Sequence, residues 1–269
     1  MLKKILIITC YVLLFGAVCA YFVFSTIITR NKQRNETCKE IKVIIRDSAQ
    51  IKFISSQEIV GLIAENGITA GESRLRHINN NQLELMLNKK TAVKNSEVSY
   101  TRDGVLRVDI SQRKPILRLE TINGGFYMDE TSYIFPLVNS YAPFVPIVSG
   151  EIPLTILPGY HGIVKDNIEW AMALRDLGIY IAERDCWNTL VEQIYVDEKG
   201  ILNIIPRTGD YEIIFGNLEK IDNKFRKLYA FYKDILPSAG EEKYCSVNLQ
   251  FDNQIVCKKN NKTDKNIQL

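Results

Sequence analysis

The chain has 269 residues, of which 46% are hydrophobic, and its 34 Lys and Arg residues against 31 Asp and Glu residues give a formal net charge of +3. The basic residues are scattered rather than gathered on one stretch, which disfavours a nucleic-acid surface. The length is sufficient for one or two domains with cores of their own. The cysteines show no metal-type spacing, and free thiols are favoured over a bridge between Cys245 and Cys257.

An uncharged run of twenty-four residues, 5–28, follows a short tail that contains Lys3 and Lys4. A helix of that length spans about 36 Å, which exceeds a hydrocarbon core of about 30 Å. We expect residues 1–4 to form a cytoplasmic tail and residues 5–28 to form a retained transmembrane helix. A cleaved signal peptide is the competing interpretation, because it begins with the same pattern. The flanking charges leave the orientation open, since more basic residues follow the run than precede it.

The next part of the chain, after a polar juxtamembrane linker over residues 29–40, predicts an α+β module. Ser55 and Glu58 form a capping-box pattern that begins a helix, and Gly67 ends it. The expected elements are a strand over 41–45, this helix, a second helix over 80–89, and a hairpin of strands over 97–101 and 105–111. Elements in that order pack as a three-stranded sheet with two helices on one face. We place this domain at residues 41–115.

The following domain, residues 116–257, is predicted to be rich in β-strands. Turn residues separate short runs of β-branched and aromatic residues, which is typical of hairpins. A helix is expected over 166–177, ended by Gly178. Strands are expected at 116–119, 126–128, 133–136, 191–196, 201–205 and 212–215.

The clearest helix of this domain is predicted over residues 217–236, with Asn217 as its cap and Pro237 just past its end. Its apolar residues recur at helical spacing. The opposite face carries four lysines, which we interpret as a solvated face: Lys220, Lys224, Lys227 and Lys233. The last strand is expected over 245–251, with a turn at Asp252 and Asn253 into a further strand. Residues 258–269 are polar and predict a disordered tail.

No catalytic constellation stands out in the sequence. The two histidines, His77 and His161, lie in segments without a metal-ligand or nucleophile pattern. Phosphate-binding glycine loops and serine-nucleophile motifs are absent from the sequence as well. Residues Asp129 and Glu130 are adjacent, so on a strand they point to opposite faces and suit a turn better than a carboxylate pair. We therefore expect a binding protein with no cofactor and no metal, and not an enzyme.

Four segments in order resemble the FtsQ/DivIB family of bacterial cell-division proteins. Behind an apolar anchor come VDISQRKP, YMDETSYIFP, VPIVSG and VNLQFDNQIV, at residues 108–115, 127–136, 145–150 and 247–256. They are similar to the family's charged-Arg-x-Pro strand end, its Asp-turn-Phe-Pro hairpin, its Pro-containing segment and its terminal strand. The strand–helix–helix–strand–strand module likewise resembles a POTRA domain. The chain departs from the family at Ser132, where the family usually has Gly.

The resemblance implies a non-enzymatic scaffold of the divisome. Such proteins are single-pass inner-membrane proteins with the N-terminus in the cytoplasm and the bulk of the chain in the periplasm, at the division septum. They bind the single-span proteins FtsB and FtsL and so help to control septal peptidoglycan synthesis by FtsW and FtsI. The family's FtsB site lies on the terminal strand and the preceding helix, which here implies Val247, Asn248, Leu249, Gln250, Phe251, Phe225, Tyr229 and Tyr232.

Edge strands explain how such a site would work. An edge strand has unpaired N–H and C=O groups, so an extended partner can add to it. We expect the terminal strand to offer such an edge, with Val247, Leu249 and Phe251 on one face; alternatively, this strand simply completes the sheet. Two other functions stay open from the residues alone: a membrane-anchored cell-envelope enzyme, and a POTRA-bearing envelope assembly component unrelated to division.

Overall fold

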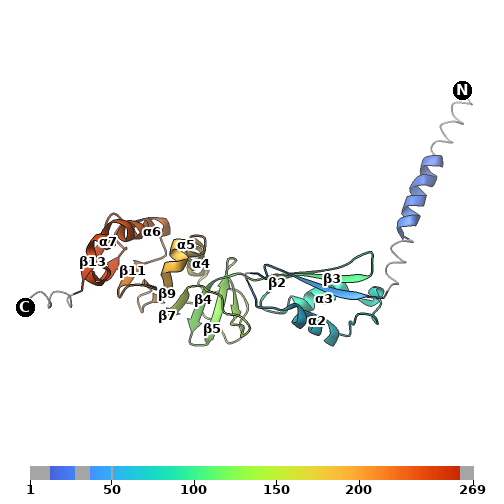
Figure 1. The fold of residues 1–269 in the computed structure, drawn as a ribbon, viewed down its shortest axis with the longest axis horizontal. Coiled ribbons are helices and arrows are strands. Elements are labelled where there is room, and N and C mark those ends of the chain that lie inside the picture. The colour runs from blue at the N-terminus through green and yellow to red at the C-terminus, as the bar shows by residue number, and fades with distance from the viewer. Residues whose placement is uncertain (1–12, 28–36, 50, 261–269) are drawn as a thin grey trace, which may run out of the picture. The chain divides into compact units, whose positions relative to one another are not determined.

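The computed structural model describes residues 13–27, 37–49 and 51–260 (Figure 1). The predicted cytoplasmic tail, most of the predicted linker and the end of the predicted C-terminal tail lie outside these residues. A helix covers residues 13–27, which is the described part of the predicted membrane span. In the described ranges, no helix is both long enough and apolar enough to cross a membrane. The chain divides into two compact units, residues 1–112 and 113–269.

The first unit has the predicted α+β order. Its elements are β1 (Glu40–Arg46), α2 (Ser56–Glu65), the 3-10 helix η1 (Leu75–His77), α3 (Asn80–Leu87), β2 (Val93–Tyr100) and β3 (Val105–Gln112). The sheet has the order β1-β3-β2, in which β1 runs parallel and β2 antiparallel to β3. The Ser55 side chain accepts a hydrogen bond from the Glu58 amide, as the capping pattern predicted.

The core of the first unit lies between the helices and this sheet. Its alternating strand residues Leu106, Val108 and Ile110 are fully buried, as are Ile59 and Ile63 of α2. A spacing of four residues places Ile59 and Ile63 on the same face of the helix. The alternating apolar side chains of β3 and the apolar side chains on one face of α2 thus form one apolar layer.

The second unit is built on a ten-stranded sheet with the order β13-β12-β11-β10-β9-β7-β4-β5-β6-β8. Its strands are β4 (Pro115–Thr121), β5 (Gly124–Asp129), β6 (Tyr133–Pro136), β7 (Ile147–Gly150), β8 (Gly162–Ile163), β9 (Val191–Val196), β10 (Leu202–Pro206), β11 (Glu212–Gly216), β12 (Tyr244–Asn248) and β13 (Val256–Lys259). Its helices are α4 (Ile168–Ala182), α5 (Asp185–Leu190), α6 (Ile221–Ala230), the π-helix η2 (Phe231–Ile235), α7 (Leu236–Ala239) and the 3-10 helix η3 (Glu241–Lys243).

Three predicted helix boundaries in this unit are wrong. Gly178 does not end its helix, because α4 continues to Ala182. A Cβ atom at Gly178 would lie 2.8 Å from Leu117 Cγ, so this glycine allows α4 to approach β4 closely. The predicted helix over 217–236 begins only at Ile221, where Lys220 rather than Asn217 is the capping residue. It changes to a π-helix at Phe231, and Pro237 lies in the first turn of α7.

The predicted hairpin of β5 and β6 is confirmed, and Asp129 organises its turn. The fully buried Asp129 carboxylate accepts hydrogen bonds from the amides of Thr131 and Tyr133 at 2.8 and 3.0 Å. It also lies 2.8 Å from Nη1 of Arg113. Ser132 has a φ of +61°, in the left-handed region that favours glycine. This backbone conformation is one that glycine adopts readily, which explains why a glycine suits position 132.

Candidate partner-binding site

The terminal strand is shorter than predicted, and both of its edges are paired. Strand β12 ends at Asn248, so Leu249, Gln250 and Phe251 lie beyond it. Val247 pairs with Ile213 of β11 on one side and with Cys257 of β13 on the other. The expectation of a free edge on this strand is therefore wrong. The sequence did suggest the second strand after Asp252, but it did not show that this strand folds back onto β12.

The free edge at this end of the sheet belongs to β13. This strand pairs with β12 on one side, and the described residues place no strand on its other side. Val256 is exposed, and Lys258 and Lys259 are exposed as well. The two lysines were predicted to begin a disordered tail, and the structure corrects this, because they belong to the strand. Lysines are frequent on edge strands, where their charge disfavours indiscriminate pairing.

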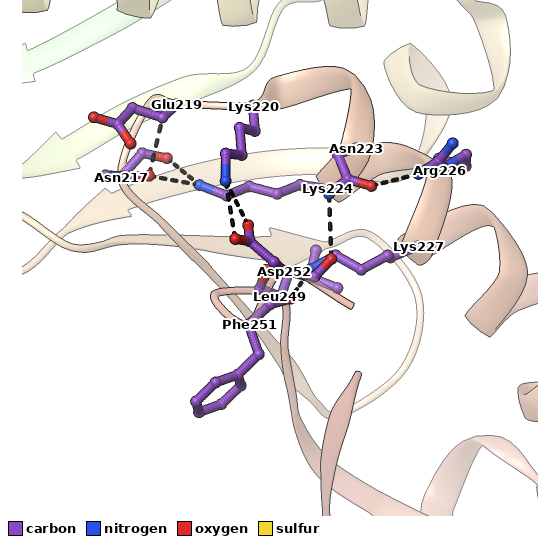
Figure 2. A network of polar contacts seen from close by, with 10 residues as sticks. All are labelled: Asn217, Glu219, Lys220, Asn223, Lys224, Arg226, Lys227, Leu249, Phe251 and Asp252. Atoms are coloured by element: carbon purple, nitrogen blue, oxygen red, sulfur yellow. Dashed lines mark hydrogen bonds and ion pairs between the residues drawn. The ribbon is translucent and has the colours of Figure 1, made fainter. Parts of the chain in front are cut away.

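Helix α6 holds the segment that connects β12 and β13. Nζ of Lys227 donates hydrogen bonds to the carbonyl oxygens of Leu249, at 2.6 Å, and of Phe251 (Figure 2). Both acceptors belong to the stretch where the chain leaves β12 and has no strand partner for them. We refer to the contacts from α6 and its capping residue Lys220 to residues 249–252 as the lysine clasp.

A second arm of the lysine clasp holds Asp252. Nζ of Lys220 lies 2.8 Å from Oδ1 of Asp252, and Nδ2 of Asn223 donates to the Asp252 carbonyl oxygen at 3.2 Å. The hydrogen bond from Lys220 lowers the pKa of the Asp252 carboxyl group, and the same contact raises the pKa of Lys220. Because both side chains are exposed, solvent screens this pair, and its role is to orient the turn rather than to stabilise the fold.

Lys224 is buried, so the prediction of a solvated lysine face is wrong at this residue. Its Nζ donates to the carbonyl oxygen of Asn217 at 2.6 Å and to Oδ1 of Asn217 at 2.8 Å. It lies 4.8 Å from the centre of the Phe215 ring, which is favourable for a cation. Burial lowers the pKa of Lys224 to about 8. Lys224 thereby ties the first turn of α6 to the chain that follows β11.

Three of the eight predicted site residues have buried side chains. Val247 and Leu249 are fully buried, and Phe225 stacks on Tyr180 with ring centres 4.7 Å apart. These three residues contribute to the core that supports the surface. Tyr232 is half-buried and accepts a hydrogen bond from the Tyr211 hydroxyl at 2.7 Å.

The other four predicted residues reach the surface to different extents. Phe251 is 46% exposed and Tyr229 is 54% exposed, and Figure 2 shows the Phe251 ring pointing away from the lysines. Gln250 is exposed and Asn248 is half-buried. The main-chain N–H of Gln250 donates a hydrogen bond to Oδ1 of Asn248 at 2.9 Å. The segment implied by the resemblance, residues 247–256, already included Val256, but sequence reasoning missed the lysine clasp. The pattern of Lys-rich helix and Asp-containing turn was visible, but it did not reveal their contact.

This arrangement suits binding of a polypeptide. It combines a free strand edge, an exposed aromatic ring and a turn that is held in place by charged side chains. Groups of three or more His, Cys, Asp or Glu residues that could hold a metal ion do not occur among the described residues. His77 and His161 are both exposed.

Comparison with known families agrees with this division into two units. A family model described as FtsQ/DivIB, C-terminal related matches residues 114–258, which is more than half of the chain. A model described as a POTRA-like domain matches residues 36–111. No curated protein matches the chain. The first match contains the whole lysine clasp and all of β12 together with most of β13.

Proposed function

The chain belongs to the FtsQ/DivIB C-terminal related family, and on this basis we propose that it is a non-enzymatic scaffold of the bacterial cell-division complex. The two family matches support a division-related scaffold with a POTRA-like domain. Within that role, we propose that the chain binds single-span partners of the FtsB and FtsL type. Through them it helps to control septal peptidoglycan synthesis by FtsW- and FtsI-type proteins.

The proposed location follows from the same membership and from the N-terminal sequence. The uncharged run over residues 5–28 holds the chain in the inner membrane, with the N-terminus in the cytoplasm and the chain that follows the run in the periplasm at the septum. Long domains are translocated largely regardless of the flanking charges, so the basic residues after the run do not oppose this orientation. Single-span partners would meet the scaffold at the same membrane.

The free edge of β13 carries the proposal for the binding mode. An extended segment of the FtsB-type partner adds to β13 by main-chain hydrogen bonds, and Phe251 and Val256 contact its side chains. The exposure of these two residues supports this assignment, since an aromatic ring at the surface is a frequent anchor of an interface. The lysine clasp fixes the turn that carries Phe251, which reduces the entropy lost on binding.

Binding of the purified full chain to the periplasmic segment of the FtsB-type protein from the same organism tests this proposal. Fluorescence anisotropy would compare the wild type with the Phe251→Asp and Val256→Asp variants, each expected to weaken binding by about tenfold or more. Ile122→Asp is the matched control, because Ile122 is a fully exposed isoleucine of the β4–β5 turn. Equal affinity of all four proteins would overturn the proposed site.

A further inference from the structure

The POTRA-like unit contains a groove between strand β1 and helix α2. Its volume is about 600 Å³, and its lining includes Ile41 and Val43 of β1 and Val60 and Gly61 of α2. Ile41 and Val43 are half-buried, whereas Val60 is 38% exposed. Strand β1, blue in Figure 1, is an edge strand, because the sheet order is β1-β3-β2. An edge strand and an adjoining apolar groove thus lie together.

The opposite edge of this sheet, on β2, is already covered by side chains of α3. The Glu84 carboxylate accepts a hydrogen bond from the Val98 amide at 2.7 Å, and Nδ2 of Asn80 donates to the Val98 carbonyl oxygen at 3.0 Å. These contacts occupy the main-chain groups that an added strand would need. On the outer edge of β1, the one comparable contact in the described part of the chain is a hydrogen bond from the Cys38 thiol to the Glu40 carbonyl oxygen at 3.4 Å, so β1 beyond Glu40 is the edge available for pairing.

The hydrogen bond of Lys39 shows which amides of β1 point outward. Its N–H donates to the carbonyl oxygen of Gly104, next to β3, at 2.9 Å. Successive residues of a strand direct their main-chain groups to alternate sides, so the N–H groups of Lys42 and Ile44 point to the free edge. This edge presents positive N–H and negative C=O groups in alternation, and another extended backbone complements that pattern of partial charge.

Gly61 is the second sign that the groove is kept open. It lies in the middle of α2, where glycine costs about 1 kcal/mol relative to alanine. Its φ is not positive, and a Cβ atom at this position would meet nothing within 4 Å. Neither backbone strain nor crowding within the unit therefore requires glycine here. A small residue at this position leaves space for a chain that lies along β1.

We propose that the groove between β1 and α2 binds an extended segment of a partner polypeptide, which adds to β1 as a further strand. The charges at the edge specify the segment further. Glu40 and Lys42 are exposed and form no ion pair with any described residue. The segment carries a basic residue opposite Glu40, an acidic residue opposite Lys42 and apolar residues that fill the groove beside Val60. This is a second docking surface, separate from the site on β13 and independent of the proposed partners there.

A display library of random peptides, selected on the full chain, is a suitable probe. The affinity of the selected peptides would then be measured for two variants. Gly61→Trp fills the groove, and Lys42→Pro removes an outward N–H but keeps the pairing of β1 with β3. Asn81→Trp on the exposed surface of α3 is the control. We expect each of the first two substitutions to reduce affinity by about tenfold or more, with the control unchanged. Circular dichroism establishes that every variant is folded.

Hydrogen exchange of the complex supplies the second measurement. The amides of Lys42 and Ile44 are expected to exchange more slowly when a selected peptide is bound, because they become hydrogen-bonded to it. The proposal is overturned if no peptide is selected, if the peptides bind folded Gly61→Trp as well as the wild type, or if these two amides exchange unchanged. It is also overturned if the full chain dimerises through β1, since a second copy would then occupy the groove.

Discussion

The ammonium group of Lys227 lies 2.6 Å from the carbonyl oxygen of Leu249, and it also holds the carbonyl oxygen of Phe251. One side chain of α6 thereby fixes the path of the chain from β12 into the turn before β13. This contact therefore affects both the stability of the second unit and the proposed binding of a partner. The core residue Leu249 and the exposed ring of Phe251 are positioned by the same contact.

Substitution of Lys227 by Met tests the lysine clasp. The variant keeps most of the aliphatic chain but leaves two carbonyl oxygens without their charged donor, which should destabilise the second unit by about 1.5–3 kcal/mol. Urea unfolding followed by tryptophan fluorescence measures this unit alone, because Trp170 and Trp187 both lie within residues 113–269. Lys233→Met, at an exposed lysine, is the control and should change stability little. Equal losses in both variants would contradict the assigned role.

The buried Lys224 predicts a pH dependence of stability. Its pKa in the folded chain is about 8, below the ordinary value of 10.5. Between these two values the unfolded state binds more protons, so this residue makes the folded state more stable as the pH rises. The free energy of unfolding of the wild type minus that of Lys224→Met should therefore increase from about pH 8 to pH 10.5. A difference that is flat or falls over this interval would show that Lys224 is not desolvated.

Ser132 offers a test of backbone strain in the β5–β6 turn. A non-glycine residue in the left-handed region costs about 1 kcal/mol, and the buried Ser132 hydroxyl oxygen has no hydrogen-bond partner among the described residues. We expect Ser132→Gly to raise the stability of the second unit by roughly 1 kcal/mol. Ser132→Ala removes the hydroxyl but keeps the Cβ atom, so it separates the two causes. If Ser132→Gly is less stable than the wild type, strain does not dominate at this turn.

Asp129 should be among the most sensitive positions of the second unit. The Asp129→Asn substitution leaves the largely buried guanidinium group of Arg113 without its charged partner, and loss of one member of a buried pair costs about 3–5 kcal/mol. Asp176→Asn is the matched control, since Asp176 is exposed and forms an ion pair with the half-buried Arg175. Chemical denaturation followed by tryptophan fluorescence compares them. Similar stability of the two variants would refute the structural role of Asp129.

The sequence predicted the local elements of this protein better than their ends. Alternation in β3 and the capping pattern at Ser55 depend on neighbouring residues, so both could be inferred from the chain itself. Gly178 misled the prediction, because a glycine that ends a helix and a glycine that permits close packing look the same in sequence. Only the approach of α4 to Leu117 distinguishes them. Pro237 likewise suited a position past a helix end but lies in a first turn.

The candidate site was harder to predict because it depends on contacts between distant residues. The apolar residues Val247, Leu249 and Phe251 have the same alternating pattern, yet two are fully buried and one is exposed, since β12 ends before Leu249. The burial of Lys224 could not be inferred from helical spacing, because it arises from the bend of the chain at Asn217. The sheet order could not be inferred from the sequence either, because β7 pairs with β9 and β4 and no local signal specifies this pairing.

Hydrogen exchange of β13 in the full chain, with and without the periplasmic segment of the FtsB-type protein, tests the proposed binding mode most directly. Strand addition requires that the outward amides of Val256–Lys259 acquire hydrogen bonds, so their exchange should slow on binding. Amides of β2, in the other unit, serve as the internal reference. If the partner binds while exchange throughout β13 stays unchanged, the proposed site on this strand is contradicted.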